Sequence, residues 1–261
     1  MKRILFLPTL TLLCLTLLGA CTSNEKATDE WVDLFNGQNL EGWVPKITGY
    51  PTGENYGNTF RVEDGLLTVS YDQYYRFDNR FGHLFYEKPF KNYHLKIEYR
   101  FIGEQVEGGA LWALKNSGVM LHSQDPYTIQ EQQDFPISLE AQFLGGTGDG
   151  PRPTGNLCTP GTHVNINGEL VETHCINAAA KTYEGEQWVT IEIISKDGVI
   201  SHILEDETVI QYYDPVIGGG IVQNFDPAVK LDGQELNSGF IALQSESHPI
   251  QFRKVQIKEL D

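Results

Sequence analysis

The segment WVTIEIISKDGVISHILEDETVIQY, residues 188–212, decides the fold class because it reads as three consecutive antiparallel strands. Apolar and polar side chains alternate along residues 189–193, which is the period-two pattern of a half-buried strand. Asp197-Gly198 is a two-residue turn of the kind that closes a β-hairpin. Residues 205–207, Glu-Asp-Glu, separate the second strand from the third. Tight turns between alternating strands predict an antiparallel sheet.

The same kind of pattern continues through most of the chain after residue 30. Further strands are expected at residues 65–69, 93–101, 239–244 and 250–257. No segment after residue 30 repeats its apolar residues with the 3.6-residue period of a helix. The chain is therefore predicted to be all-β, a two-sheet antiparallel β-sandwich of the jelly-roll type. About 230 residues suffice for one large sandwich, and no linker divides them, so we expect a single domain over residues 31–261.

The first twenty residues have the layout of a signal peptide. Residues 1–3 are basic, residues 4–18 are apolar, and Leu18-Gly19-Ala20-Cys21 resembles a bacterial lipobox. Residues 1–20 are therefore predicted to be a lipoprotein signal peptide, with Cys21 as the lipidated residue. Residues 21–30 are polar and lack apolar periodicity, as a flexible tether would. The protein is expected to be exported and lipid-anchored, in the periplasm or at the cell surface.

The charge balance restricts the choice of partners. The chain has 35 acidic and 19 basic residues, a formal net charge of −16. Such a surface repels nucleic acid and anionic headgroups, so no nucleic-acid partner is expected, and membrane contact only through the N-terminal lipid. Neutral sugars are indifferent to this field, and divalent cations are attracted by it.

Two cysteines remain after the signal peptide and the lipid site, Cys158 and Cys175. An even pair in an oxidising compartment predicts a disulfide. The alternative is a metal site that also uses His163 and His174. Its spacing fits no zinc pattern, and adjacent residues 174 and 175 would point to opposite faces of a strand.

Residues 137–144 form a strand with polar groups where a core strand would be apolar. Ile137, Leu139, Ala141 and Phe143 alternate with Ser138, Glu140, Gln142 and Leu144. Period-two geometry places Glu140 and Gln142 on one face, about 7 Å apart. If that face lines a hollow, the carboxyl and the amide converge on a pocket, with His122 available from a neighbouring strand. If it faces outward, they are ordinary solvated residues.

Several motifs, taken in order, resemble the 3-keto-disaccharide hydrolase domain family over residues 31–261. They are Trp31-Val32-Asp33-Leu34-Phe35-Asn36-Gly37, Phe60-Arg61-Val62-Glu63-Asp64-Gly65, Asn116-Ser117-Gly118-Val119, Ser138-Leu139-Glu140-Ala141-Gln142-Phe143 and Phe252-Arg253-Lys254-Val255-Gln256. The resemblance implies a concanavalin A-like jelly roll that acts on oxidised sugars. Residues 145–156, rich in glycine, are expected to form an enlarged loop over the groove that influences specificity.

The substrate class implied by this resemblance suggests a mechanism. A ketone at sugar carbon 3 acidifies the hydrogen on carbon 2, so a base can remove it and the group on carbon 1 leaves by β-elimination. Addition of water then gives net hydrolysis. The route needs a base, an electrophile for the enolate oxygen, and an acid for the leaving group.

Candidate residues follow from these needs. The predicted catalytic residues are Glu140, His122 and His174. A divalent metal ion held by His122 and Glu140, with His174 as a further ligand, would stabilise the enolate. The substrate, an oligosaccharide or 3-keto-glycoside, is expected to contact polar and aromatic side chains, namely Gln142, Asn116, Trp112, Arg76, Arg80 and Tyr75.

Two alternatives stay open. One is a non-catalytic carbohydrate-binding lipoprotein on the same fold. The other is a conventional glycosidase, but such an enzyme needs two carboxyl groups. Glu140 has no second carboxylate two or four residues along its strand.

Overall fold

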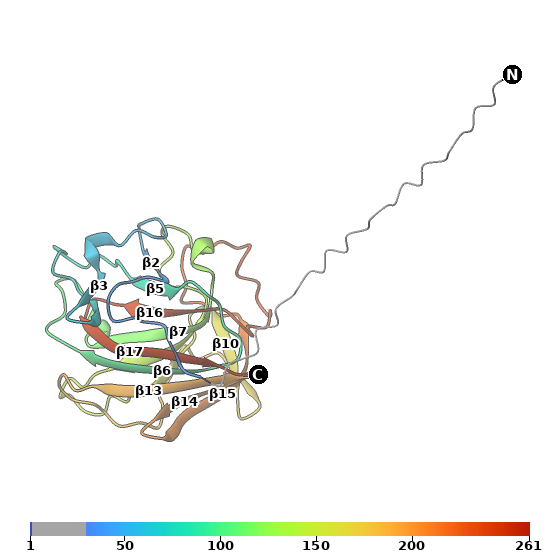
Figure 1. The fold of residues 1–261 in the computed structure, drawn as a ribbon. Helices are drawn as coiled ribbons and strands as arrows, with labels where there is room; N and C mark the ends of the chain where they lie inside the picture. Colours follow the sequence, from blue (N-terminus) through green and yellow to red (C-terminus); the bar gives the residue numbers. More distant parts are fainter. Residues whose placement is uncertain (2–29) are drawn as a thin grey trace.

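Two antiparallel sheets stacked face to face make up the computed structural model, which describes residue 1 and residues 30–261 (Figure 1). This arrangement confirms the predicted two-sheet β-sandwich. The predicted signal peptide, the lipidation site Cys21 and most of the tether lie outside the described residues. In the described part of the chain, no helix is long and apolar enough to cross a membrane.

The larger sheet has ten strands, and β1 pairs with β17 beside its main path. In spatial order the strands are β11 (Glu169–Val171), β10 (Thr162–Ile166), β15 (Glu207–Ile217), β14 (Val199–Leu204), β13 (Val189–Lys196), β6 (Tyr93–Phe101), β17 (Ile250–Glu259), β4 (Leu66–Val69) and β3 (Phe60–Glu63), with β1 (Val32–Asp33) next to β17.

The smaller sheet has seven strands and holds the site described below. In spatial order these are β12 (Cys175–Ile176), β9 (Asn156–Cys158), β8 (Leu139–Leu144), β7 (Asn116–Ser123), β16 (Phe240–Ser245), β5 (Gly82–Tyr86) and β2 (Trp43–Ile47). The helical turns of the described residues are three short 3₁₀ segments, η1 (Tyr56–Asn58), η2 (Leu111–Ala113) and η3 (Pro126–Thr128).

Side-chain alternation fixes the register of the larger sheet. Buried and partly exposed residues alternate along all nine positions of β6. Ile97 at its centre lies opposite Ile191 of β13 and Val255 of β17. The predicted hairpin turn is confirmed, since Asp197 and Gly198 both have positive φ, 51° and 80°. Positive φ at both central residues is what a type I′ turn requires, and glycine adopts it without strain.

The core lies between the sheets, and it decides which face of the smaller sheet is left for function. Leu139, Ala141 and Phe143 of β8 are fully buried in this core. The Phe143 ring stacks on Tyr99 of the opposite sheet with the ring centroids 4.2 Å apart. Because side chains alternate along a strand, Glu140 and Gln142 lie on the outer face of the smaller sheet.

The strands that the sequence analysis did not predict are short or atypical. Pro45 interrupts the pattern of β2, which is tolerated because β2 is the edge strand of its sheet. The strands β9 to β12 contain two to five residues each and lie close to the segment expected to be a loop. Runs this short carry too little alternation to be distinguished from turns.

The predicted disulfide between Cys158 and Cys175 is confirmed, with the two Cα atoms 4.2 Å apart. It joins directly opposed residues of β9 and β12 at the edge of the smaller sheet. Cys158, His174 and Cys175 form the one group in the described chain with metal-ligand atoms close together, within 4.8 Å. Both sulfur atoms are bonded to each other, so neither is the thiolate that a zinc site uses.

We expect replacement of both cysteines, Cys158→Ser with Cys175→Ser, to lower the free energy of unfolding by about 3 kcal/mol, because the cross-link restricts the unfolded chain. Urea unfolding followed by fluorescence measures the change. Reductant should destabilise the wild type by a similar amount and leave the double variant unaffected. An unchanged urea midpoint in the double variant would contradict this account.

Candidate active site

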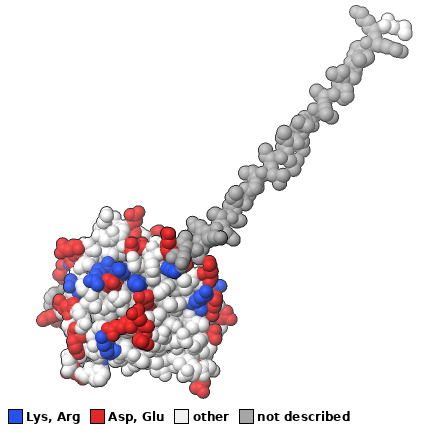
Figure 2. All heavy atoms as spheres, turned by 60° about the horizontal axis from the view of Figure 1, so that its bottom comes forward, with Lys and Arg blue, Asp and Glu red and all other residues white. Residues whose placement is uncertain are grey.

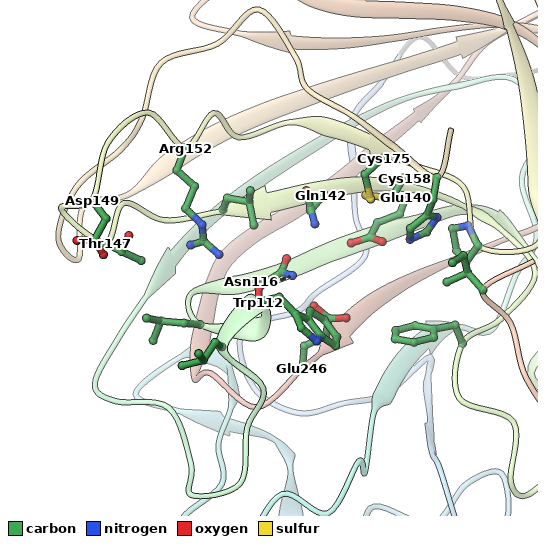
Figure 3. Close-up of a pocket in the computed structure, with 17 residues that line it drawn as sticks. Trp112, Asn116, Glu140, Gln142, Thr147, Asp149, Arg152, Cys158, Cys175 and Glu246 are labelled. Atoms are coloured by element: carbon green, nitrogen blue, oxygen red, sulfur yellow. Dashed lines mark hydrogen bonds between the residues drawn. A yellow bond between two sulfur atoms is a disulfide. The ribbon is translucent and has the colours of Figure 1, made fainter. Parts of the chain in front are cut away.

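A cleft of about 780 Å³ lies on the outer face of the smaller sheet (Figure 3). Strands β7, β8, β9 and β12 contribute residues to it, and η2 and the surrounding loops supply the rest. The lining comprises Leu111, Trp112, Leu114, Asn116, Phe135, Glu140, Gln142, Leu144, Thr147, Asp149, Arg152, Cys158, Pro160, His174, Cys175, Ile221 and Glu246. A cleft of this size, with apolar walls and a few polar groups, is typical of a small-molecule site.

Strand register brings the polar groups of the cleft together. Glu140 lies opposite Cys158 of β9, and Gln142 lies opposite Gly118 of β7. Figure 3 shows the Glu140 and Gln142 side chains projecting from the same strand into the cleft. The expected convergence of a carboxyl and an amide on a pocket is therefore found on this face.

Gly118 leaves the space that the Glu140 side chain occupies. A Cβ atom on residue 118 would lie 2.4 Å from Oε1 of Glu140 and 2.8 Å from its Cγ. These distances are far shorter than van der Waals contact, so Glu140 leans across the bare backbone of β7. Any larger residue at position 118 would displace the carboxyl.

A second carboxyl, that of Glu246, enters the cleft from the end of β16. The expectation that Glu140 lacks a carboxyl partner is wrong, because the partner comes from another strand and not from its own. A signal for it was present in the sequence. Ala242 lies on the outer face, so alternation places Gln244 and Glu246 on that face as well.

Burial makes both carboxyl groups hard to ionise, and the charge of Glu140 adds to this effect at Glu246. Burial raises the pKa of Glu140 to about 8. The pKa of Glu246 is also raised well above its ordinary value, first by burial and then by the charge of Glu140. Two carboxyls in such a site share protons, and near neutral pH the pair retains at least one. Loss of one proton from the pair leaves a carboxylate and a carboxylic acid, that is, a base and an acid, within one cleft.

Several hydrogen-bonding groups in the cleft have no partner in the described structure. Oδ1 of Asn116 and Oε2 of Glu246 are buried acceptors without a donor. Gln142 is oriented by Asn156, whose Nδ2 donates to its Oε1 at 3.0 Å. Because that bond occupies the carbonyl oxygen of Gln142, its NH₂ group remains as a free donor beside the carboxyl pair. Buried unpaired groups of this kind are expected where a ligand supplies the partner.

His174 lines the same cleft, next to the disulfide. Burial lowers its pKa, so its imidazole is neutral at pH 7. Its Nδ1 is buried and has no hydrogen-bond partner. The structure thus brings together two of the three predicted catalytic residues, Glu140 and His174.

His122 does not reach the cleft. Its Nδ1 is 2.8 Å from the Leu236 carbonyl and its Nε2 is 3.0 Å from Oγ of Ser195, on the opposite sheet. The reason is a break in the pairing of β7 with β16 next to His122, which has a positive φ of 46°. A β-bulge of this kind redirects a side chain. The expectation that His122 is available to the pocket from the neighbouring strand is therefore wrong.

The position of His122 also rules out the expected metal site of His122 and Glu140. His122 and Glu140 lie on different sides of the smaller sheet, so together they do not fit a shared divalent ion. Glu140 and His174 both line the cleft, but Glu140 does not belong to the described group whose ligand atoms cluster, which joins His174 to the disulfide-bonded Cys158 and Cys175.

The predicted substrate-binding residues divide into two groups. Asn116, Gln142 and Trp112 line the cleft. Arg76 is instead paired with Glu107. The Tyr75 side chain is 89% exposed and lies away from the cleft. Arg80 lies in a neighbouring groove.

Arg152 is a cleft residue that the sequence analysis missed. It lies in the glycine-rich loop predicted to border the groove, and Thr147 and Asp149 of the same loop also line the cleft (Figure 3). Its Nη1 donates to the carbonyl of Lys115 at 3.0 Å and to that of Gly145. Burial lowers its pKa, and no carboxylate pairs with it in the described structure. The guanidinium is the one basic side chain, histidine aside, that lines the cleft.

Figure 2 shows acidic side chains scattered over one face and basic side chains in small groups between them. A jelly-roll sandwich whose cleft combines an aromatic ring, amides and a carboxyl pair has the features of a carbohydrate-active protein.

The chain belongs to the family of the 3-keto-alpha-glucoside-1,2-lyase-like domain, whose sequence profile matches residues 30–258. This confirms the family resemblance and supports a carbohydrate-active function. No curated protein matches the chain.

Solved structures confirm the fold. Two proteins proposed to be glycosyl hydrolases, both from Parabacteroides distasonis ATCC 8503, are 20% and 18% identical, with TM-scores of 0.52 and 0.53. Each match covers 88% of this chain, and 94% and 100% of the other chain. A Bacillus subtilis protein of unknown function with a galectin-like fold has a TM-score of 0.52 at 11% identity, covering 90% of this chain and 97% of its own.

We expect Glu246→Gln to stabilise the protein in a pH-dependent way. The folded-state pKa of Glu246 lies above its unfolded value, so the folded chain retains a proton that the unfolded chain releases. The contribution of Glu246 to wild-type stability therefore falls as pH rises above about 4.5. The variant avoids that loss, and its Tm should exceed that of the wild type by several degrees at pH 8, with no gain at pH 4.

Thermal unfolding across this pH range measures the effect. Glu41→Gln, a substitution at an exposed position, is the matched control and should follow the wild type at every pH. A Glu246→Gln variant that is less stable than the wild type at pH 8 would show that the carboxyl is paired and ionised.

Proposed function

We propose that this protein is an exported, lipid-anchored enzyme that cleaves 3-keto-glycosides by proton abstraction and β-elimination. The observation that carries the proposal is the buried carboxyl pair, Glu140 and Glu246, in a cleft that also holds an amide donor and an exposed tryptophan. The family description, which refers to a 1,2-lyase acting on a 3-keto-α-glucoside, supports an elimination across carbons 1 and 2.

The pair supplies the base and the acid that the reaction needs. With one proton shared, one group is a carboxylate and the other a carboxylic acid. The carboxylate takes the hydrogen on carbon 2, and its electron pair forms the enolate of the carbon 3 ketone. The enolate then expels the oxygen on carbon 1, which receives the proton of the carboxylic acid. The products are a 3-keto sugar with a double bond between carbons 1 and 2, and the free leaving group.

Neutral donors near the pair support the enolate. The free NH₂ group of Gln142, held in place by Asn156, is a pre-oriented donor of the kind that stabilises a developing oxyanion. Neutral His174 offers a further proton acceptor close to the disulfide. Addition of water to the double bond would give net hydrolysis and restore the carboxyl protonation state.

The same carboxyl pair supports a second candidate, a conventional glycosidase. Such enzymes place one raised-pKa carboxyl as acid and a second carboxyl as nucleophile or base. This candidate acts on sugars without a ketone, whereas the elimination requires one. Substrate oxidation state therefore separates the two.

A mass-spectrometric assay with a 3-keto-disaccharide and its unoxidised counterpart tests the proposal. We expect the full-length protein to cleave the oxidised sugar alone. Glu140→Gln and Glu246→Gln should each lower kcat by about 10²–10⁴-fold, because each removes one proton-transfer group. The wild-type pH profile should be bell-shaped, since activity needs one proton on the pair.

The exposed-site variant Glu41→Gln is again the control and should retain full activity. Cleavage of the unoxidised sugar would instead establish the glycosidase. Retention of sugars without any product would indicate a binding protein.

Gly118→Ala tests whether the position of Glu140 matters, as distinct from its presence. The new methyl group occupies the space of the carboxyl, so we expect kcat to fall by at least about tenfold while KM changes little. Thermal unfolding should change by only a few degrees, because the displaced atoms belong to the end of a flexible side chain. Gly118→Ala with full activity would remove Glu140 from the mechanism.

A further inference from the structure

A second groove of about 780 Å³ adjoins the cleft. The cleft and the second groove share Trp112, Phe135 and Ile221. These three side chains form a common wall between two adjoining hollows. The walls of the second groove come from residues 48–50, 78–81, 132–135 and 221–224. None of the carboxyl pair, Gln142 or His174 lies in it.

We propose that the second groove is an additional saccharide subsite, which binds the neutral sugar units of an oligosaccharide beyond the unit held at Glu140 and Glu246. This inference rests on the proposed function, because it assigns the cleft to the reacting sugar.

The chemistry of the groove matches neutral hydroxyl groups. The exposed side-chain amides of Gln132 and Gln223 have no hydrogen-bond partner in the described structure, and each offers two donors and an acceptor. The charged groups are already matched. Arg80 is paired with Asp78 at 2.9 Å, and the Asp134 carboxylate accepts from backbone nitrogens, at 2.8 Å in each case. The groove therefore offers free neutral hydrogen-bonding groups, while its charged side chains are engaged within the protein.

The groove is also held in shape before any ligand binds. The backbone nitrogen of Gln223 donates to Asp134, and Nδ2 of Asn224 donates to the carbonyl of Gln132 at 3.0 Å. On the other side, Oγ1 of Thr48 donates to the carbonyl of Gln133 at 3.1 Å. Loops tied in this way lose little freedom on binding, which favours affinity.

The dividing wall provides an apolar surface for sugar rings. Trp112 is 55% exposed, and its ring is stacked on Phe81 with an interplanar angle of 17°. The stacking fixes the plane of the indole, whose free surface can pack against the C–H groups of a sugar. A ring seated there would contact both hollows.

Ile221, the third residue of this wall, has an unfavourable backbone conformation. Its φ is +74°, a region that β-branched residues rarely adopt, and its side chain is 50% exposed. Ile221 is not part of the buried core, so core packing does not explain this backbone conformation. Strained residues of this kind cluster at ligand sites, and Ile221 faces both hollows.

Binding of unoxidised gluco-oligosaccharides to the full-length protein tests the subsite independently of catalysis. Isothermal titration calorimetry compares sugars of two and four units, in α-1,4 and β-1,3 linkage. For one linkage at least, we expect the wild type to bind the four-unit sugar about tenfold more tightly than the two-unit sugar. The double variant Gln132→Ala with Gln223→Ala should lose this length preference and retain the two-unit affinity.

Gln38→Ala, an exposed glutamine away from both hollows, is the matched control and should keep the preference. Equal affinity for both lengths in the wild type, no binding of any of these sugars, or an unchanged preference in the double variant would each overturn the subsite. Failure of the proposed function has a different signature, since it is absence of 3-keto-disaccharide cleavage, whatever the length dependence of binding.

Discussion

The pairing of β7 with β8 is the constraint on which the cleft depends. It places Gly118 directly opposite Gln142, two residue pairs from the pair of Met120 with Glu140. The missing side chain at residue 118 leaves room for the Glu140 carboxyl to lie across β7. The inward side chains of β8 hold the strand against the opposite sheet, so the register cannot slip without moving apolar residues into solvent. Core packing and site geometry are thus set by the same strand.

Such a site has a cost for the fold. Two carboxyl groups share a buried cleft, and the nearby acceptors of Asn116 and Glu246 have no partners. Each feature is unfavourable in an empty protein, because burial penalises charge and leaves polar atoms unsolvated. The surrounding sandwich tolerates them. A buried polar cleft of this kind is thus kept at the expense of stability.

The sequence was sufficient for the strands that make up most of the larger sheet and for half of the cleft. Alternation located β6 and β14 to the residue, and it placed Glu140 and Gln142 on one outward face. It failed for His122, because a bulge is a departure from alternation that the pattern itself does not announce. It also did not predict that Glu140 and Glu246 share a cleft. Their strands, β8 and the end of β16, are neighbours of β7 on its two sides, and only the sheet topology shows this. Contacts between strands distant in the chain are set by topology, and no single segment encodes them.

The placement of the disulfide has a consequence for the chain before it matures. Strand β12 has only two residues, so its hydrogen bonds alone give it little hold on β9. The covalent bond between Cys158 and Cys175 keeps it there and covers the outer edge of β9. A newly made chain whose thiols are still reduced would present β9 as an open sheet edge, which can pair with a strand of another molecule. By holding β12 in place, the cross-link therefore also protects this edge of the sheet from such pairing.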